Sequence, residues 1–521
     1  MCSLWLCVNS NQNTEMNKRY IEIMDTTLRD GEQTSGVSFS ATEKLTIAQI
    51  LLQEVKVDRI EVASARVSEG ELEAVKKITN WAKNNGFLEK VEVLTFVDGE
   101  ASINWMLEAG AKVMNLLTKG SLNHLTHQLR KTPEEHFNEI EKVITLAKNK
   151  GIDANVYLED WSNGMRNSPI YVFQFLDFLT QQPIKRVLLP DTLGVLTPYE
   201  TYDFVKQIVE RYPNTHFDFH AHNDYDLSIA NVMEALRAGA HGLHLTVNGM
   251  GERCGNAPLA SAIAVINDCM PEFKTAVVEK SLYSVSKIVE TFSGFHIPVN
   301  KPIVGENVFT QTAGIHADGD NKKNLYFNDL MPERFGRKRK YALGKTSGKA
   351  NIEKNLQELG IRLSDADLKK VTQRIIELGD KKEMVTREDL PYIISDVIDS
   401  SSVVEEKIQI LNYVLTHSKN LKPSATLQLS IDNQTYEEIA QGDGQYDAFM
   451  NALKKILLKK HIALPQLSDY HVRIPPGGKT DALCETIITW QYNGKEFKTR
   501  GLDSDQTVSA IQATQKMLNL I

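Results

Sequence analysis

The feature that most limits the possible folds is an alternation of short apolar runs with amphipathic helical patterns, repeated eight times between residues 20 and 268. Eight strand–helix units in about 250 residues are the number that closes a parallel (β/α)8 barrel. A doubly wound open sheet is the alternative, but it usually contains fewer units. The predicted strands are residues 21–24, 59–63, 91–96, 113–117, 154–158, 187–189, 217–219 and 242–247. We therefore predict an α/β fold with a TIM barrel over residues 20–285.

Polar side chains follow many of these runs at the point where each predicted strand ends. Arg29 and Asp30 follow the first run, Glu159 ends the fifth, Thr192 follows the sixth, His220 and His222 end the seventh, and a glycine-rich segment, 248–256, follows the eighth. The carboxyl ends of all strands meet on one face of a barrel, and that face carries the active site. These residues are therefore predicted to share one site.

His220 and His222 are separated by one residue, so on a strand their side chains point to the same face. An isolated pair of this kind is often no more than two polar residues where a strand meets a loop. Here Asp30 adds a carboxylate from another strand end, and Asn256 could add a carbonyl oxygen, directly or through water. The predicted metal ligands are Asp30, His220, His222 and Asn256, a set that suits a divalent metal ion such as Mn²⁺, Mg²⁺ or Zn²⁺.

Arg29 is suited to an anionic substrate because its guanidinium can form two parallel bonds to a carboxylate. With a hydroxyl donor from Thr192 and the metal, this predicts a 2-oxo acid that binds through its carboxylate and keto oxygens. The alternative for Arg29 is a structural ion pair with Asp30 or Glu32. Glu159 and His316 are candidates for proton transfer. His316 lies in a polar segment, so it reaches the barrel mouth only if that segment, from its own or a neighbouring subunit, folds over it.

The remainder of the chain divides by pattern into three further parts. Residues 1–19 are predicted to be a disordered N-terminal extension, with translation starting at Met1 or Met16. Residues 286–400 form a linker region that is helical except for the polar segment 305–348. Residues 401–521 form a small α+β domain made of two strand-then-helix blocks, with strands at 426–431, 470–474 and 484–490 and helices at 446–459 and 505–518.

Composition excludes several classes of partner. The chain has 59 basic and 67 acidic residues, a formal charge of −8, and its basic residues are scattered, so no nucleic-acid surface is predicted. No apolar run approaches the ~20 residues that span a membrane. The five cysteines form no Cys-x-x-Cys pair, which fits a reduced, cytoplasmic location.

Three segments carry a resemblance to a known family: 25–33 (DTTLRDGEQ), 219–224 (FHAHND) and 248–256 (NGMGERCGN). They resemble the motifs of the barrel acyltransferases that comprise isopropylmalate, homocitrate and citramalate synthases. Family members usually carry alanine at the position of Cys254, and a small thiol there should behave as a small apolar residue. The resemblance extends from Ile21 to the C-terminus. Segments 115–121 (NLLTKGS), 156–164 (VYLEDWSNG) and 318–326 resemble the citramalate synthase branch.

The resemblance implies a Claisen-type condensation of acetyl-CoA with pyruvate to give (R)-citramalate and CoA, in isoleucine biosynthesis. The alternative within the family is 2-isopropylmalate synthesis, with 2-oxoisovalerate as the acceptor. An alternative of another class is a non-catalytic, metal-dependent amino-acid sensor built on the same barrel. The resemblance also implies a homodimer.

Roles for individual residues follow from the same resemblance. Arg29 and Thr192 would bind the pyruvate carboxylate, Leu94, Leu117 and Tyr157 would close on its methyl group, and Phe96 would lie on the acetyl-CoA side. The catalytic residues would be Arg29, Glu159, His316 and Tyr326, and Asp318, Asn324 and Leu325 would line a cover over the site.

The C-terminal domain resembles the amino-acid-sensing domain of the family, so feedback inhibition by isoleucine is implied. The sequence does not distinguish isoleucine from leucine as the effector. The apolar members of the implied effector site can also be understood as the core of a small domain. The positions that match effector contacts are Tyr446, Asp447, Leu467, Tyr470, Ile474, Thr480, Cys484 and Gln506.

Overall fold

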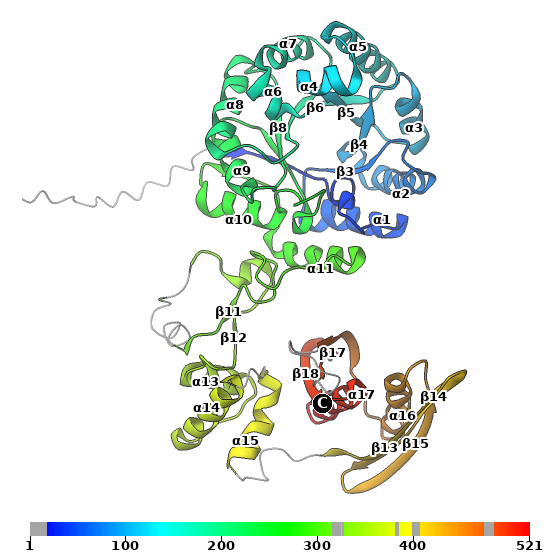
Figure 1. Cartoon of the computed structure of the whole chain (residues 1–521), viewed down its shortest axis with the longest axis vertical. Helices are drawn as coiled ribbons and strands as arrows, with labels where there is room; N and C mark the ends of the chain where they lie inside the picture. The colour runs from blue at the N-terminus through cyan, green and yellow to red at the C-terminus, as the bar shows by residue number, and fades with distance from the viewer. Residues whose placement is uncertain (1–17, 315–324, 326–327, 381–384, 399–406, 474–483) are drawn as a thin grey trace, which may run out of the picture. The chain divides into compact units, whose positions relative to one another are not determined.

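The computed structural model describes residues 18–314, 325, 328–380, 385–398, 407–473 and 484–521. The chain divides into two compact units (Figure 1). The barrel unit comprises Met1–Phe309 and Asn328–Lys338, and the C-terminal unit comprises Thr310–Phe327 and Arg339–Ile521. Within the described ranges, no helix is both long and apolar enough to cross a lipid bilayer.

The barrel unit contains the predicted eight-stranded closed barrel, and all its strands are parallel and paired in chain order. The strands are β2 (Glu22–Asp25), β3 (Arg59–Ser64), β4 (Val91–Phe96), β5 (Val113–Lys119), β6 (Asp153–Glu159), β7 (Arg186–Asp191), β8 (Phe217–Ala221) and β9 (Gly242–Leu245). The prediction of a (β/α)8 fold is therefore confirmed. β9 pairs with β2 to close the barrel, which brings the first and last motifs together.

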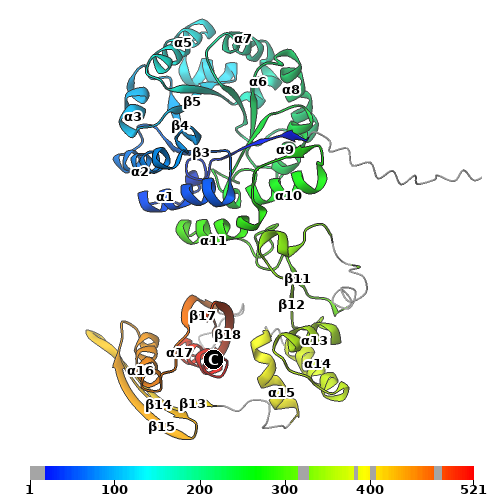
Figure 2. The ribbon, with the colours of Figure 1, turned by 180° about the vertical axis from the view of Figure 1, so that it is seen from behind.

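Helices surround the strands on all sides, as Figure 1 and the view from behind in Figure 2 show. Those that follow successive strands are α1 (Ala41–Ile50), α2 (Glu69–Asn85), α3 (Ala101–Ala109), α5 (Pro133–Asn149), α7 (Pro169–Leu179), α8 (Pro198–Arg211), α9 (Ser228–Arg237) and α10 (Leu259–Cys269). Two short helices, α4 (Leu122–His124) and α6 (Trp161–Asn167), precede α5 and α7, and α11 (Leu282–Ser293) follows the barrel. α1, α5 and α8 each begin with a capping box, which fixes where the helix starts.

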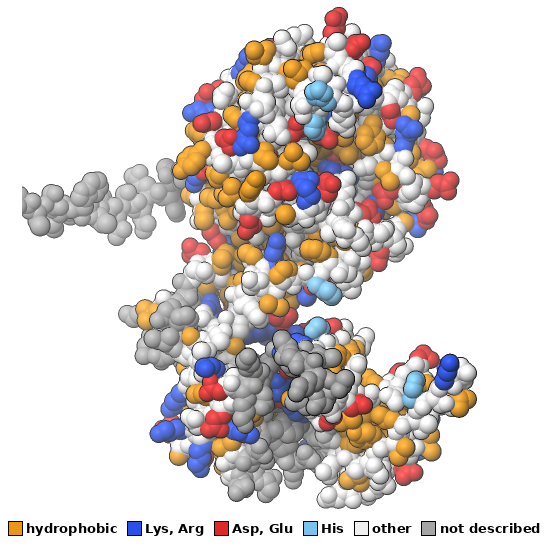
Figure 3. Space-filling model, viewed as in Figure 1, with side chains coloured by type: hydrophobic (Ala, Val, Ile, Leu, Met, Phe, Trp, Pro, Cys, Tyr) orange, Lys and Arg blue, Asp and Glu red, His pale blue; other side chains and the backbone are white. Residues whose placement is uncertain are grey.

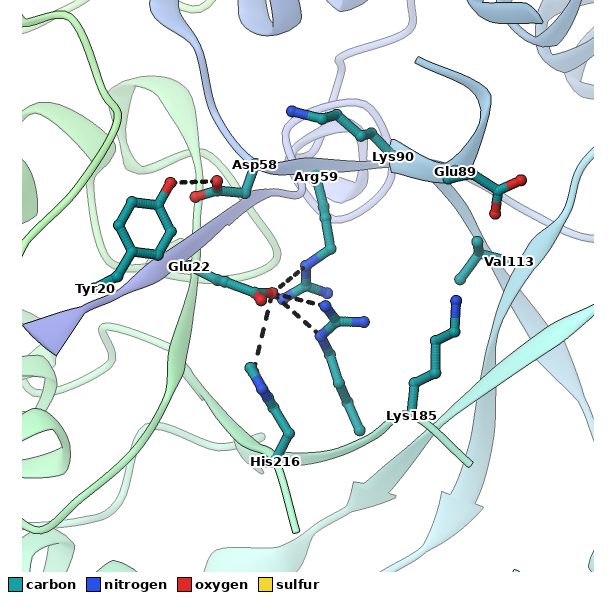
Figure 4. A pocket seen from close by; sticks show the side chains of 10 residues that line it. Tyr20, Glu22, Asp58, Arg59, Glu89, Lys90, Val113, Lys185 and His216 are labelled. Atoms are coloured by element: carbon teal, nitrogen blue, oxygen red, sulfur yellow. Dashed lines mark hydrogen bonds and ion pairs between the residues drawn. The ribbon is translucent and has the colours of Figure 1, made fainter. Parts of the chain in front are cut away.

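The amino-terminal end of the barrel is lined by charged side chains. Glu22 accepts ion pairs from Arg59, with Nε at 3.2 Å, and from Arg186, with Nη2 at 2.8 Å. Figure 4 shows these contacts at a cavity of about 520 Å³ that His216 also lines. Each of these ion pairs joins residues of two different strands, so the ion pairs link the strands at this end of the barrel.

On the barrel face visible in Figure 3, basic and acidic side chains are interspersed. This pattern matches the scattered charges of the sequence and is typical of a solvated surface.

The C-terminal unit begins with a helical cluster. Its helices are α13 (Lys349–Glu358), α14 (Asp365–Asp380) and α15 (Leu390–Ile398), and two short strands, β11 (Thr310–Gln311) and β12 (Lys340–Tyr341), pair in parallel. Ile352, Val371 and Ile375 are among the buried side chains that form the core of this cluster. The prediction of helices interrupted by irregular chain in this region agrees with these elements.

The last part of the C-terminal unit is a repeat of three antiparallel strands followed by one helix. The first block is β13 (Ile408–Ser418), β14 (Leu421–Ile431), β15 (Gln434–Gln441) and α16 (Gln445–Lys459), and the second is β16 (Gln466–Arg473), β17 (Cys484–Tyr492), β18 (Lys495–Asp503) and α17 (Gln506–Leu518). Both helices pack with the strands into one apolar core. The predicted two-block α+β domain is confirmed, but β13, β15 and β18 were not predicted.

Lys44 on α1 ties three parts of the barrel unit together. Its Nζ atom is fully buried and lies 2.6 Å from a carboxylate oxygen of Glu32 and of Glu71. It also donates to the backbone carbonyls of Leu28, at 3.1 Å, and Val62, at 3.3 Å. The segment that carries Arg29 and Asp30 is therefore anchored to α1, β3 and α2.

We predict that Lys44→Met destabilises the barrel by about 3 kcal/mol, because it leaves two carboxylates and two carbonyls without their buried cation. Urea unfolding of the full chain measures this change. The control is Lys77→Met, which removes an exposed ion pair with Glu73 and should be nearly neutral. Equal unfolding midpoints for the wild type and Lys44→Met would contradict the anchoring role.

Candidate active site

Asp30, His220 and His222 converge at the carboxyl end of the barrel, as the sequence predicted. All three are buried, and one possible ligand atom from each lies within 4.8 Å of the others. His220 Nε2 is 3.2 Å and His222 Nε2 is 3.9 Å from Asp30 Oδ2. The turn after β2 places the carboxylate, because the backbone N–H of Asp30 donates to the carbonyl of Thr26.

Unpaired buried atoms at this site fit a divalent cation. Asp30 Oδ1, His220 Nδ1, His222 Nδ1 and Asn256 Oδ1 are buried and have no hydrogen-bond partner within the described parts of the chain. Asn256 forms a backbone bridge with His222, and its amide nitrogen donates to the carbonyl of Met250 at 3.0 Å. That bond turns the side-chain oxygen of Asn256 away from Met250. Each of the four predicted ligands therefore keeps one polar atom without a partner among the described residues, which is costly unless a ligand supplies one.

The protonation states at the site also fit a metal. Burial alone would raise the pKa of Asp30, but Arg29, His220 and His222 together lower it well below its usual range. Burial lowers the pKa of His222 to about 4. Near neutral pH, Asp30 is thus a carboxylate and His222 a neutral imidazole, and both are the forms that bind metal ions.

Arg29 is held at the edge of this group by three contacts. Its Nε donates to Glu61 at 2.5 Å, Nη1 lies 3.3 Å from Asp30 Oδ2, and Nη2 lies 3.4 Å from the Tyr157 hydroxyl. The ion pair with Asp30 that was considered as an alternative is present, whereas Glu32 pairs with Lys44 instead. Glu61, which the sequence did not predict, binds Nε and leaves both terminal nitrogens directed toward the site.

Leu94, Leu117 and Tyr157 form an apolar cluster together with Leu188. The four come from adjacent strands, β4 to β7, and the strand register places Leu117 beside Tyr157 and Tyr157 beside Leu188. Leu188 was not predicted, although it is the inward-facing residue of its strand at this level. Phe96 ends β4 next to Leu117 and is half-buried.

Tyr157 is the polar member of this cluster. Its hydroxyl lies 2.9 Å from His244 Nδ1, and His244 Nε2 lies 3.2 Å from Asp218 Oδ2. Burial lowers the pKa of His244 to about 3 and raises the pKa of Tyr157 well above 10. The sequence analysis missed His244 and Asp218. The available signal was their position, because Asp218 is two residues before His220 and His244 is the register partner of His220.

Glu159 ends β6 and forms an ion pair with Lys119, which ends β5. Lys119 is buried, and its backbone N–H donates to His136 Nε2 at 3.2 Å. Lys119 was not predicted as a site residue, although a lysine at the carboxyl end of a barrel strand is the signal that could have identified it.

Thr192 follows β7, and its hydroxyl oxygen accepts a hydrogen bond from the backbone N–H of Asp160 at 2.9 Å. Its carbonyl accepts from Arg253, which also pairs with Asp224. The hydroxyl hydrogen of Thr192 can therefore be donated to a ligand.

Several predicted positions are not placed at the site. Those outside the described residues are His316, Asp318, Asn324, Tyr326, Ile474 and Thr480. Leu325 is described and is 68% exposed in the C-terminal unit. The roles predicted for these residues stay predictions.

Part of the predicted effector site is assembled in the C-terminal unit. The rings of Tyr446 and Tyr470 lie 5.5 Å apart, and Tyr446 bonds to Thr514 Oγ1 at 2.7 Å. Burial raises the pKa of Tyr470, and a hydrogen bond with Gln506 opposes this shift.

Cys484 lies close enough to raise the pKa of Tyr470 further. Two other predicted effector residues have different surroundings. The carboxylate of Asp447 accepts a hydrogen bond from the backbone N–H of Asp443 at 2.8 Å. The side chain of Leu467 is 40% exposed.

Comparisons with known proteins agree with this architecture. The HMGL-like family profile matches residues 20–289, a homocitrate synthase post-HMGL domain-like profile matches 303–383, and a LeuA allosteric (dimerisation) domain profile matches 384–521. The chain is 34% identical to (R)-citramalate synthase CimA of Methanocaldococcus jannaschii, over 96% of this chain and 99% of that protein. It is 33% identical to 2-isopropylmalate synthase of Methylorubrum populi, over 97% and 96% of the two chains.

Similarity of this extent spans the barrel, the helical region and the C-terminal domain together. A putative (R)-citramalate synthase CimA of Archaeoglobus fulgidus shows the same coverage, with 33% identity over 96% of this chain and 99% of that protein. This protein therefore belongs to the HMGL-like family of barrel enzymes, among the citramalate and 2-isopropylmalate synthases.

Proposed function

We propose that this enzyme condenses acetyl-CoA with pyruvate and water to give (R)-citramalate and free CoA. The observation that carries this proposal is the apolar cluster of Leu94, Leu117, Tyr157 and Leu188 beside Arg29 and the metal-binding group. An acceptor with an anionic end and a short apolar end fits this combination. The full-length similarity to a citramalate synthase supports the same reaction.

The carboxylate and keto group of pyruvate are bound at the edge between Arg29 and the metal ligands. The terminal nitrogens of Arg29 and the hydroxyl of Thr192 donate to the carboxylate. A divalent cation held by Asp30, His220, His222 and Asn256 supplies, when bound, a Lewis acid for the keto oxygen. Arg29 also keeps Asp30 ionised, so the same guanidinium serves substrate and metal sites.

Proton transfer requires a group that can take a hydrogen from the methyl of acetyl-CoA. Glu159 is proposed as this group. Its position supports the role, because it ends β6 two residues beyond Tyr157 and on the same face of the strand. Its ion pair with Lys119 orients the carboxylate. His316 and Tyr326 are proposed to assist, on the resemblance alone.

The bulky apolar cluster is proposed to favour the methyl group of pyruvate over larger side chains. Tyr157 and the three leucines would limit the space for the isopropyl group of 2-oxoisovalerate. Each additional methylene changes binding to an apolar pocket by about 1–3 kcal/mol. Discrimination against an acceptor that is larger by two carbons is therefore substantial but finite.

The C-terminal domain is proposed to bind isoleucine and to lower activity as it does so, in a homodimer. The LeuA allosteric (dimerisation) domain profile and the grouping of Tyr446, Tyr470, Cys484 and Gln506 support this assignment. Inhibition requires that isoleucine binds two states of the enzyme with different affinity, typically by about 1–3 kcal/mol.

The reaction is tested by measuring free thiol from acetyl-CoA with a panel of 2-oxo acids and Mn²⁺. We expect kcat/KM for pyruvate to exceed that for 2-oxoisovalerate by about 100-fold or more. Thiol release only with 2-oxoisovalerate would establish 2-isopropylmalate synthesis instead. Release with no acceptor would favour the amino-acid sensor.

The metal site is tested with Asp30→Asn and His222→Gln. Both should abolish tight Mn²⁺ binding in calorimetry and lower kcat by about 1,000-fold, since several kcal/mol of charge stabilisation are lost. The matched control is His127→Gln, which changes an exposed histidine outside the site. A chelator should inactivate the wild type and Mn²⁺ should restore it, whereas full activity of metal-stripped enzyme would refute the assignment.

Regulation is tested by ending the chain after Ile398, which should remove inhibition by isoleucine even if some activity is lost. In the full chain, Gln506→Ala should weaken isoleucine binding, because the hydrogen bond with Tyr470 is removed. Gln491→Ala, at an exposed position of β17, is the control. Undiminished inhibition of the shortened chain would place the effector on the barrel.

A further inference from the structure

We infer that Asp218 and His244 are positioning residues for Tyr157, and that through the ring of Tyr157 they set the size of the 2-oxo acid that the pocket accepts. This inference rests on the proposed function and deepens it. Neither residue belongs to the metal-binding group or to the apolar cluster. Their effect on the substrate would pass through two buried hydrogen bonds, and the direction of each bond can be assigned from the contacts.

Asp218 is the fixed end of this chain of bonds. Its Oδ2 lies 2.5 Å from Arg59 Nη2, and its Oδ1 lies 2.8 Å from His216 Nε2. Arg59 is always a cation and can only donate, so its contact with Oδ2 makes Asp218 the acceptor and pairs it as a carboxylate. As a carboxylate, Asp218 accepts hydrogen bonds and cannot donate them.

The hydrogen on His244 follows from this state. His244 Nε2 lies 3.2 Å from Asp218 Oδ2, so Nε2 must carry the hydrogen that is donated. Arg29 Nη2 can only donate and lies 3.4 Å from the phenol oxygen of Tyr157, which leaves the phenol hydrogen for His244 Nδ1.

Tyr157 then has a defined orientation. Its hydroxyl, 2.9 Å from His244 Nδ1, must donate to that nitrogen, and its oxygen is 3.4 Å from Arg29 Nη2, which can only donate. Since the phenol uses its hydrogen on His244, it has none to give to a substrate. What Tyr157 presents to the pocket is the side of its ring.

The position of the ring decides the shape of the pocket. It lies edge to face with His220, with ring centres 6.2 Å apart, and packs with Leu94, Leu117 and Leu188. Apolar contacts with leucine side chains have no preferred direction, so they do not orient the ring of Tyr157. The hydrogen bond to His244 is directional and does orient it. Without that bond the hydroxyl loses its buried acceptor, and the ring can leave the place where it limits the length of the acceptor side chain.

Three variants separate the hydrogen bond from the bulk of the side chains. His244→Leu removes both bonds, and Tyr157→Phe removes the hydroxyl but keeps the ring. His244→Gln is the conservative variant, because its amide nitrogen can donate to Asp218 and its carbonyl can accept from Tyr157. The readout is the ratio of kcat/KM for pyruvate to kcat/KM for 2-oxobutanoate, which is longer by one methylene.

We expect His244→Leu and Tyr157→Phe each to lower this ratio by about tenfold, the low end of the discrimination that one methylene gives. His244→Gln should stay within about twofold of the wild type. The double variant should show the same loss as either single variant, because both remove one shared bond. An unchanged ratio in both single variants, additive losses, or an equal loss in His244→Gln and His244→Leu would overturn the inference.

Mn²⁺ affinity is measured in every variant, since the ring of His244 is centred 5.7 Å from that of His220. A ratio that falls together with Mn²⁺ affinity would mean that His244 acts on the metal site, and would overturn the inference. If His244→Leu does not fold, Tyr157→Phe carries the test, because it removes the same bond without opening a large cavity.

Crystal structures of the wild type, His244→Leu and His244→Gln give a readout that does not depend on turnover. The ring of Tyr157 should move only in His244→Leu. A wild type that releases no thiol with any 2-oxo acid would refute the proposed function, while the position of the ring would still decide the positioning role. An unmoved ring in all three structures would refute that role.

Discussion

The ionised carboxylate of Asp30 is the group on which the rest of the site depends. It is almost fully buried, and Arg29, His220 and His222 are its neighbours. A buried charge persists only where opposite charges and hydrogen bonds compensate the loss of water. Asp30 therefore requires Arg29 beside it and the closure of the barrel that brings β8 close to β2. The turn after β2 carries Asp30, and the buried Lys44 anchors this turn through the carbonyl of Leu28 and the carboxylate of Glu32.

The same logic explains why the inside of this barrel is polar over much of its length. Arg59 is bound by Glu22, Glu92 and Asp218, and Glu61 links Arg29 to Asn115. Each of these charges has a partner from another strand, so the network fixes the strand register as well as the charges. Buried networks in which each charge is paired favour one arrangement of the chain. Arg29 and Asp30 are then held in place by buried partners from the barrel strands.

Particular residues show how far the sequence predicts this structure. The eight strands and the His220, His222 and Asp30 group were predicted because they repeat a pattern or stand at strand ends, where fold geometry gives them a shared location. His244 was missed because a single histidine inside an apolar strand has no spacing signal, and its role depends on which strand becomes its neighbour. Asp218 did carry a signal, since it lies two residues before His220 and on the same face of the strand, but the sequence analysis did not use it.

The missed strands of the C-terminal domain have a different cause. β13 and β15 expose most of their side chains. β15 carries no apolar run, whereas the apolar residues of β13, at 410–411 and 413–415, were not recognised as a strand. β18 was missed for a related reason, because charged residues such as Lys495, Lys498 and Arg500 interrupt its apolar positions. Helices α16 and α17 were predictable because each buries one apolar face.

The way the pocket is built also bears on how its selectivity can change. Leu94, Leu117 and Leu188 pack with Tyr157 in one apolar cluster, so a smaller or larger side chain at one leucine alters the pocket by its own volume. Tyr157 is hydrogen-bonded to His244, and His244 to Asp218, in a buried network. Removing one of these residues leaves the next without its hydrogen-bond partner. Replacing one member of such a network costs more than its own contact is worth, whereas replacing all members by apolar groups of matching shape can be tolerated. Under the proposed function, the leucines are therefore the positions at which acceptor size can be adjusted in single steps. The tyrosine is the position at which it can change only together with its supporting residues.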